Sequence, residues 1–242
     1  MKVRIKFRKY GVLRYIGHLD VMRYFQKALR RAELPVAFTS GYSPHMIMSF
    51  ASPLGIGLTS SGEYFDLELT EAVDSAEAVA RLNAVGVEGI EVLSLVQIPE
   101  DKKSGGMASI AAAEYLISIK ENSSLGVETF TPEWDEAIKA FLRQPSVLVN
   151  KKTKRSEQVV DILPMIYCLE RRPQGIFMRL ATGSEQNLKP GLVMQALCEF
   201  TGRSYNELDY HTHRVELYGR SPENGQLYTL ESAGKTIVWK EN

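Results

Sequence analysis

The amino-acid sequence predicts an α+β protein made of two tandem ferredoxin-like units, each a βαββαβ arrangement with an antiparallel sheet. Residues 2–8 and 63–69 alternate apolar and polar side chains, which is the period-two pattern of a half-buried strand. Over residues 1–98 the predicted elements follow the order strand, helix, strand, strand, helix, strand. Residues 112–242 repeat much of this order after a linker at 99–111, so we expect two domains.

In the first half, apolar residues three to four positions apart predict a helix over 18–32, which Pro35 ends. Asp74 is a suitable N-cap for a second helix. The remaining predicted elements are strands at 35–39 and 46–50 around a turn at 41–45, the strand at 63–69, the helix at 74–82 and a strand at 89–97. In this topology the first and third strands are neighbours, with helices on one face of the sheet and the other face open.

The second half is predicted from the same kinds of pattern. Thr131 and Pro132 open a helix that runs to Leu142, because Pro suits the first helical turn. Residues 163–174 fit either a short helix or a strand. The other expected elements are strands at 114–120, 146–150, 158–162, 175–181 and 214–218, a helix at 189–200, a hairpin turn at 151–155 and a further strand near Tyr228.

Composition indicates a soluble globular protein, with 44% hydrophobic and 24% charged residues. The sequence has no apolar run long enough to cross a membrane and no secretory signal pattern. Cys168 and Cys198 are far apart and form no metal-binding motif, so we expect no metal and no cofactor, and a reduced, cytoplasmic location. The HxH pair His211 and His213 is interpreted as two surface histidines.

Charge is unevenly distributed along the chain. The net charge is zero, yet residues 1–31 carry ten Lys or Arg and one acid, whereas residues 71–101 carry seven acids and one base. Such a molecule can hold an anionic partner on one face. The alternative is that the two charged regions only solvate their surfaces.

The outer face of the first strand is a candidate RNA-binding surface. Its basic side chains could contact phosphates, and Tyr64 on the neighbouring strand could stack on a base. The alternative is structural, because Asp66 and Glu68 share that face and opposite charges across strands stabilise a sheet. The full set of candidate RNA-binding residues is Arg4, Lys6, Arg8, Lys9, Arg14, His18, Arg23, Lys27, Arg30, Arg31, Tyr42, Ser43, His45 and Tyr64.

Basic residues also surround the first predicted helix. Lys27, Arg30 and Arg31 lie near its end, and Lys9 and Arg14 lie in the loop before it. The free N–H groups at a helix start suit a phosphate. Anion binding and a merely solvated helix face are therefore both open.

His18 and His45 are the candidates for catalysis, because two imidazoles could act as acid and base in RNA cleavage. The structural alternative, which we prefer, is that His18 caps the helix and His45 holds its turn. Glu63 falls on the buried side of its strand and needs a partner there, since an unpaired buried charge is costly. Arg14 or a histidine could supply it.

The run YIGHLDVMRYFQKALRRAELPVAFTSGYSPHMIMSFASPLGIGLTSSGEYFDLEL resembles the bacterial radical-SAM-linked proteins, a domain family of unknown function. The likeness is carried by GHLD, ALRRA, PVAFTSGYSPH and PLGIG…GE, and continues weakly through KKTKR…VVDI and NLKPG. Tyr42-Ser43 and Met46 depart from the family pattern in the turn. The resemblance implies a radical-SAM protein as partner and carries over no catalytic residue.

A looser likeness, in fold and charge only, is to the CRISPR repeat-processing endoribonucleases. The sequence thus predicts a non-catalytic, RNA-binding recognition partner of a radical-SAM, RNA-modifying enzyme. Two alternatives are a metal-independent endoribonuclease using His18 and His45, and a protein-interaction adaptor that does not touch RNA.

Overall fold

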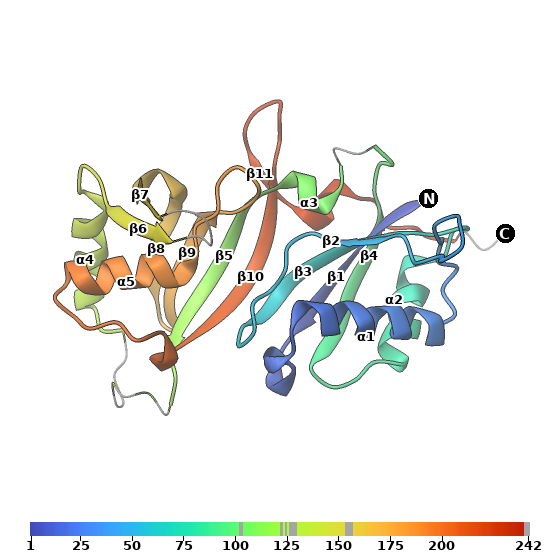
Figure 1. Ribbon diagram of the computed structural model, residues 1–242, viewed down its shortest axis with the longest axis horizontal. Coiled ribbons are helices and arrows are strands. Elements are labelled where there is room, and N and C mark those ends of the chain that lie inside the picture. Colours follow the sequence, from blue (N-terminus) through green and yellow to red (C-terminus); the bar gives the residue numbers. More distant parts are fainter. Residues whose placement is uncertain (102–103, 122, 124, 126–129, 153–156, 240–242) are drawn as a thin grey trace. The chain divides into compact units, whose positions relative to one another are not determined.

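The computed structural model describes residues 1–242 except 102–103, 122, 124, 126–129, 153–156 and 240–242 (Figure 1). The fold is mixed α/β, with few helices and mostly antiparallel strands. The chain divides into two compact units: unit 1 is Met1–Ala111 with Arg214–Asn242, and unit 2 is Ala112–His213. The sequence assigns residues 112–242 to one C-terminal domain, whereas in the structure residues 214–242 group with the N-terminal half.

Unit 1 holds most of the elements that the first half predicts. In chain order these are β1 (Lys2–Lys9), the 3-10 helix η1 (Gly11–Tyr15), α1 (His18–Arg31), β2 (Met48–Phe50), β3 (Thr59–Glu68), α2 (Ser75–Ala84), β4 (Ile90–Gln97) and α3 (Gly106–Ser109), followed by the end of β10 (Tyr210–Arg220), β11 (Leu227–Thr229) and the 3-10 helix η4 (Leu230–Ala233). The strand order is β4-β1-β3-β10, with β2 on β3 and β11 on β10. Ile5 pairs with Phe65 of β3 and with Leu95 of β4, which places β1 between them.

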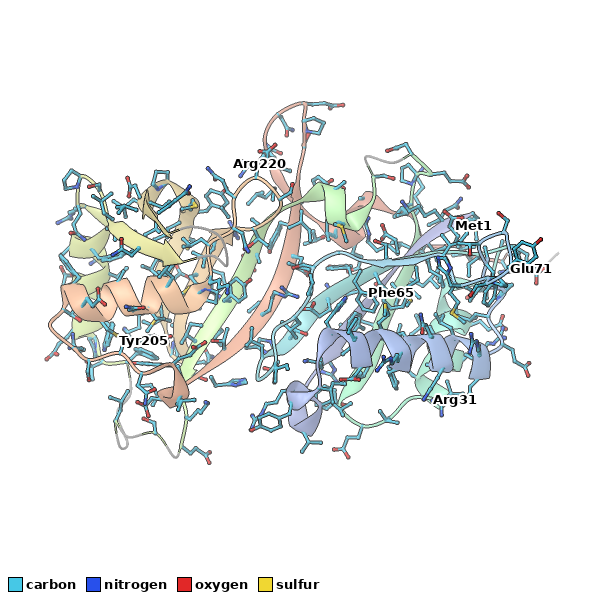
Figure 2. All side chains as sticks on the ribbon, viewed as in Figure 1. Met1, Arg31, Phe65, Glu71, Tyr205 and Arg220 are labelled. Carbon is cyan, nitrogen blue, oxygen red and sulfur yellow. The ribbon has the colours of Figure 1, made fainter. Side chains whose placement is uncertain are left out.

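The core of unit 1 lies between its sheet and its two longer helices. Val21, Phe25 and Leu29 form the buried side of α1. The helical spacing predicts Phe25 and Leu29 correctly, but it also predicts Leu19 on this side, and Leu19 is 59% exposed. The buried side of α1 packs against the alternating apolar residues of β1 and β3; the ring centroids of Phe25 and Phe65 are 4.6 Å apart. Figure 2 marks Phe65 on β3 in this core. Burying these side chains fixes which face of β1 looks toward α1.

The predicted boundaries in unit 1 are partly confirmed. The Asp74 carboxylate accepts hydrogen bonds from the N–H groups of Ala76 and Glu77, so the predicted N-cap of α2 is correct. The prediction of a strand at 35–39 is wrong, because this segment makes only isolated bridges, among them Val36 to Leu69. A proline and a neighbouring turn leave too short a run to pair continuously.

Unit 2 contains β5 (Ile110–Ile119), α4 (Glu133–Leu142), β6 (Leu148–Lys152), β7 (Glu157–Asp161), the 3-10 helix η2 (Leu163–Met165), β8 (Ile166–Arg172), β9 (Gly175–Ala181), α5 (Pro190–Phe200), the 3-10 helix η3 (Glu207–Asp209) and the start of β10. The strand order is β10-β5-β9-β8. The predicted hairpin is confirmed as β6 and β7, although its basic turn at 151–155 falls partly on residues outside the described ones.

The tandem ferredoxin-like prediction is not confirmed. In unit 2, β6 and β7 pair with each other as a separate two-stranded sheet, whereas a ferredoxin-like unit would place both in the main sheet. A single sequence predicts strand existence better than strand partners, because pairing depends on residues far along the chain. Residues 163–174, left open between helix and strand, form η2 and then β8.

Candidate functional site

The outer face of β1, the face that carries Arg4, Lys6 and Arg8, is largely an internal ion-pair surface. The Arg4 guanidinium is 1% exposed and donates to Asp66 from Nε at 2.7 Å and from Nη2 at 3.1 Å. It also donates to the carbonyls of Leu230 at 3.0 Å and Ser104 at 2.7 Å. The expectation that this face is open is therefore wrong at Arg4, because η4 and the segment before α3 cover it.

Lys6 and Tyr64 join the same internal network. Lys6 Nζ lies 2.7 Å from Glu216 and 3.3 Å from Glu231, and the Tyr64 hydroxyl donates to Glu216 at 2.7 Å. Tyr64 is 1% exposed, so the prediction that it stacks on a base is wrong for this structure. Strand β10 supplies Glu216 and η4 supplies Glu231, two elements that lie more than 140 residues after Tyr64 in the sequence. Arg8, by contrast, is exposed and pairs with Glu91.

The helix α1 carries exposed basic residues. The basic residues of this helix are Arg23, Lys27, Arg30 and Arg31, and all four are exposed. Arg23 lies 3.7 Å from Asp20, and Arg31 donates to the Val85 carbonyl at 2.8 Å. Within the described part of the chain, Lys27 and Arg30 have no ion-pair partner. Figure 2 shows Arg31 at the C-terminal end of α1.

The predicted turn at 41–45 is exposed, and it does not bring His45 to His18. The His45 Nδ1 atom is 3.1 Å from Thr39 Oγ1, so this histidine holds its own turn, as one alternative predicted. The ring of His18 packs edge-on against Phe50, with centroids 5.0 Å apart. His45 precedes Phe50 by five residues of mostly extended chain, which spans about 16 Å at 3.3 Å per residue. Tyr42 and Ser43 are likewise exposed in this turn.

A small pocket lies beneath the start of α1, and we call it the Lys9 pocket. Its lining residues are Phe7, Lys9, His18, Val21, Phe50, Ser52, Leu54 and Glu63. It is partly open and has about 10 Å³ for the centres of water-sized groups, which is the space of roughly one water. Three segments that carry the family resemblance therefore meet at one place, around His18, residues 52–54 and Glu63.

Glu63 and Arg214 form the buried ion pair at the base of this pocket. Glu63 is 3% exposed and receives two hydrogen bonds from the Arg214 guanidinium, one of them from Nε at 2.7 Å. Arg214 also donates to Ser52, at 3.4 Å to the hydroxyl and 3.2 Å to the carbonyl. The buried position of Glu63 is confirmed, but its partner is Arg214 rather than Arg14 or a histidine.

Lys9 is the second buried cation of the pocket, and it is weakly bonded. The side chain is 1% exposed, and Nζ donates to the Ile16 carbonyl at 3.4 Å. Burial lowers the pKa of Lys9; Glu63 opposes this shift and Arg214 adds to it. The Lys9 amine is thus a buried donor with spare hydrogen-bonding capacity.

His18 lines the pocket from the first turn of α1 and is partly exposed. Burial lowers the pKa of His18 and Glu63 opposes the change, so the ring is neutral at neutral pH. Gly17 is the N-cap, and no His18 side-chain cap is formed, so the predicted capping role of His18 is wrong. The first hydrogen bonds of the helix are donated by the N–H groups of Asp20 and Val21 to the Gly17 carbonyl. The N–H groups of His18 and Leu19 come before these in the chain, at the helix start, where N–H groups have no partner within the helix.

Sequence reasoning found His18, Glu63 and Lys9 separately and did not find Arg214 or Ser52. Arg214 stands only as the first residue of a predicted strand, 151 residues after its partner. Arg14 lies outside the pocket lining, where it stacks on Tyr15 with its guanidinium carbon 4.8 Å from the ring centroid. The one signal for this ion pair in the sequence is Glu63, a carboxylate on the buried side of its strand that needs a partner.

Raising the pH is expected to stabilise the wild-type protein relative to Lys9→Met. The folded pKa of Lys9 lies below its ordinary value of 10.5, so between these two values the unfolded chain binds more protons and stability rises with pH. Below the folded pKa the difference between the two proteins is constant. Urea unfolding of both proteins at several alkaline pH values measures this difference. The free energy of unfolding of the wild type minus that of the variant should rise with pH; a value that stays constant or falls up to pH 10.5 contradicts the burial of a charged Lys9.

The remaining side chains add no second candidate. Among the described residues, no three His, Cys, Asp or Glu side chains are grouped as metal ligands, and His211 and His213 are partly buried rather than on the surface. No helix in the described ranges has the length and apolarity to cross a membrane.

Comparison with known proteins identifies a family model. A model described as "Uncharacterized protein conserved in bacteria (DUF2344)" matches residues 2–190. No curated protein matches the chain.

Proposed function

The chain belongs to this family of uncharacterised bacterial proteins, DUF2344, and we propose that it binds RNA along α1 as the recognition partner of a radical-SAM enzyme in the cytoplasm. The radical-SAM partner is supported by the sequence resemblance around GHLD and PLGIG…GE. RNA modification is the reaction class that would need a separate chain to recognise the substrate. The protein itself then supplies binding rather than chemistry.

The exposed cations of α1 are the observation that carries RNA binding. Arg23, Lys27 and Arg31 are four residues apart, which places them in one row along the helix, with Arg30 beside it. A row of cations on a rigid helix can contact successive phosphates. Unlike Arg4 and Lys6, which bond to buried acids, Lys27 and Arg30 are exposed and carry no ion pair among the described residues.

A protein-interaction adaptor is the second candidate, and one observation favours it. Val12, Tyr15, Leu19 and Ile56 are large apolar side chains exposed at 77, 61, 59 and 67%, near the start of α1. Exposed apolar groups of this kind mark protein contact surfaces when they are contiguous. The endoribonuclease alternative is not favoured, because His18 packs on Phe50, whereas His45 contacts Thr39 in its own turn.

Removing three α1 cations is expected to weaken RNA binding and to flatten its salt dependence. In Lys27→Gln/Arg30→Gln/Arg31→Gln, each lost phosphate contact should reduce the slope of log K against log salt by about 0.7, or about 2 in total. Glutamine keeps helix propensity, so α1 should remain folded. Fluorescence anisotropy of a labelled single-stranded RNA, measured over a salt series, gives the slope.

A matched control removes three exposed cations of unit 2, in Lys139→Gln/Arg143→Gln/Lys189→Gln. The control should keep the wild-type slope. Equal loss in both triple variants would show that only net charge matters. Absence of RNA binding by the wild type at about 50 mM salt would favour the adaptor.

A further inference from the structure

The Lys9 pocket contains a buried cation whose hydrogen bonds are incomplete. An ammonium group has three donors, and Lys9 Nζ makes one contact, to the Ile16 carbonyl at 3.4 Å, a long distance for such a bond. The side chain is 1% exposed and lines the pocket. A buried charge is costly unless it is paired and hydrogen-bonded. The Lys9 ammonium can therefore donate to an acceptor at the position beside it in the pocket.

The charges around that position sum to an excess of one cation. Glu63 is bonded by Arg214 through two hydrogen bonds, so its charge is already matched, and Lys9 is left over. His18 is neutral at neutral pH and adds no charge. The acceptor that completes this site is consequently an anion rather than a neutral group.

The start of α1 is suited to the same ligand. The first N–H groups of α1, on His18 and Leu19, lie at the positive end of the helix and precede its internal bonds. Ser60 pairs with Lys9 across β1 and β3, and its hydroxyl is buried without a hydrogen-bond partner among the described residues, but it does not line the pocket. A register shift between Phe7 and Lys9 brings these two residues opposite each other.

We propose that the Lys9 pocket binds one oxygen of a terminal phosphate, with the Lys9 ammonium as its principal donor. The inference rests on the proposed function, and it makes that phosphate the end group of the RNA strand held along α1. The pocket has room for about one water-sized group, so a single oxygen enters and the rest of the phosphate stays at the mouth, beside the start of α1. An internal phosphodiester offers less charge and is more hindered than a phosphate monoester.

The test compares RNA strands that differ only at their ends. Strands of about eight nucleotides, with a 5′-phosphate, a 3′-phosphate or hydroxyls at both ends, are titrated against wild type. One phosphorylated strand is expected to bind about 10–100-fold tighter than the hydroxyl strand, the range for one charge-assisted hydrogen bond at a buried site. In Lys9→Met this ratio should fall to about one while binding of the hydroxyl strand is retained.

The α1 triple variant separates the two proposals. It should weaken binding of every strand equally and leave the ratio between phosphorylated and hydroxyl strands unchanged. If it has no effect but the ratio exists and is lost in Lys9→Met, the phosphate site stands and the α1 surface fails. A ratio near one for both phosphorylated strands in wild type overturns the phosphate site and indicates that the pocket holds only water.

Proton uptake provides a readout that does not depend on the folding of a variant. Calorimetric titration of the wild type with inorganic phosphate is carried out at several pH values up to 10.5, in buffers of different ionisation enthalpy. In the alkaline range where the buried Lys9 amine titrates, binding should take up protons, because the anion favours the charged form of the amine. Phosphate binding with no proton uptake at any of these pH values, or no phosphate binding, overturns the proposal.

Discussion

Replacing Arg4 with methionine is expected to lower the free energy of unfolding by about 3–5 kcal/mol, the usual cost of removing one partner of a buried ion pair. Methionine retains the apolar stem, so the loss comes from the guanidinium. Asp66 is 4% exposed and would keep the Gly106 N–H at 2.7 Å and Lys2 at 3.9 Å. The carbonyls of Leu230 and Ser104 would also lose their donor.

Arg8→Met is the matched control for Arg4→Met. Arg8 is also an arginine on the outer face of β1, but it is exposed and pairs with partly exposed Glu91. Surface pairs contribute about 0–1 kcal/mol, so its loss should be small. Urea unfolding compares the two variants. Similar small losses in both would mean that Arg4 is accessible, and the outer face would again be a candidate RNA surface.

Replacing Glu63 with glutamine is expected to cost about 3–5 kcal/mol of stability, because two buried cations would lose their common anion. Arg214 is 3% exposed and donates two hydrogen bonds to this carboxylate. Glutamine has nearly the same shape, so packing against Phe7, which pairs with Glu63 across β1 and β3, is retained. The amide accepts at one oxygen only and carries no charge.

Glu91→Gln serves as the control, since Glu91 is partly exposed and pairs with Arg8 at the surface. Thermal and urea unfolding of both variants measure the contrast. A loss in Glu63→Gln no larger than in Glu91→Gln would show that Glu63 is not a buried, paired charge. The base of the Lys9 pocket would then be assigned incorrectly.

Local pattern was sufficient to predict β1, α1 and α2. Val3, Ile5 and Phe7 alternate with basic residues, and burial of one side of a strand dictates that alternation. The side chain of Asp74 bonds to N–H groups two and three residues later, an interaction that the sequence shows directly. Such features depend on neighbours within a few positions.

A single sequence could not predict that η4 and the segment before α3 cover the outer face of β1. Arg4 bonds to Leu230, 226 positions away, and Lys6 bonds to Glu216, 210 positions away. The alternating sequence of a half-buried strand is the same whether its polar side faces water or other charged residues. The acids Asp66 and Glu68 indicated the structural alternative, and for Asp66 the structure bears it out.

The Lys9 pocket was visible in the sequence only as separate parts. Lys9 is expected in a loop, but β1 extends through it, and its side chain continues the buried alternation of Ile5 and Phe7. His18, expected as a cap or a catalyst, packs on Phe50 and lines the pocket. Only the tertiary fold shows that these residues and Glu63 are neighbours.

Cross-linking tests the central claim, RNA binding along α1, most directly. RNA containing 4-thiouridine is bound to the wild-type protein, irradiated and digested, and the linked peptides are identified by mass spectrometry. We predict links within residues 18–31, with links from a phosphorylated end near residues 9–18. Links confined to residues 112–213, or none at low salt, would contradict the account.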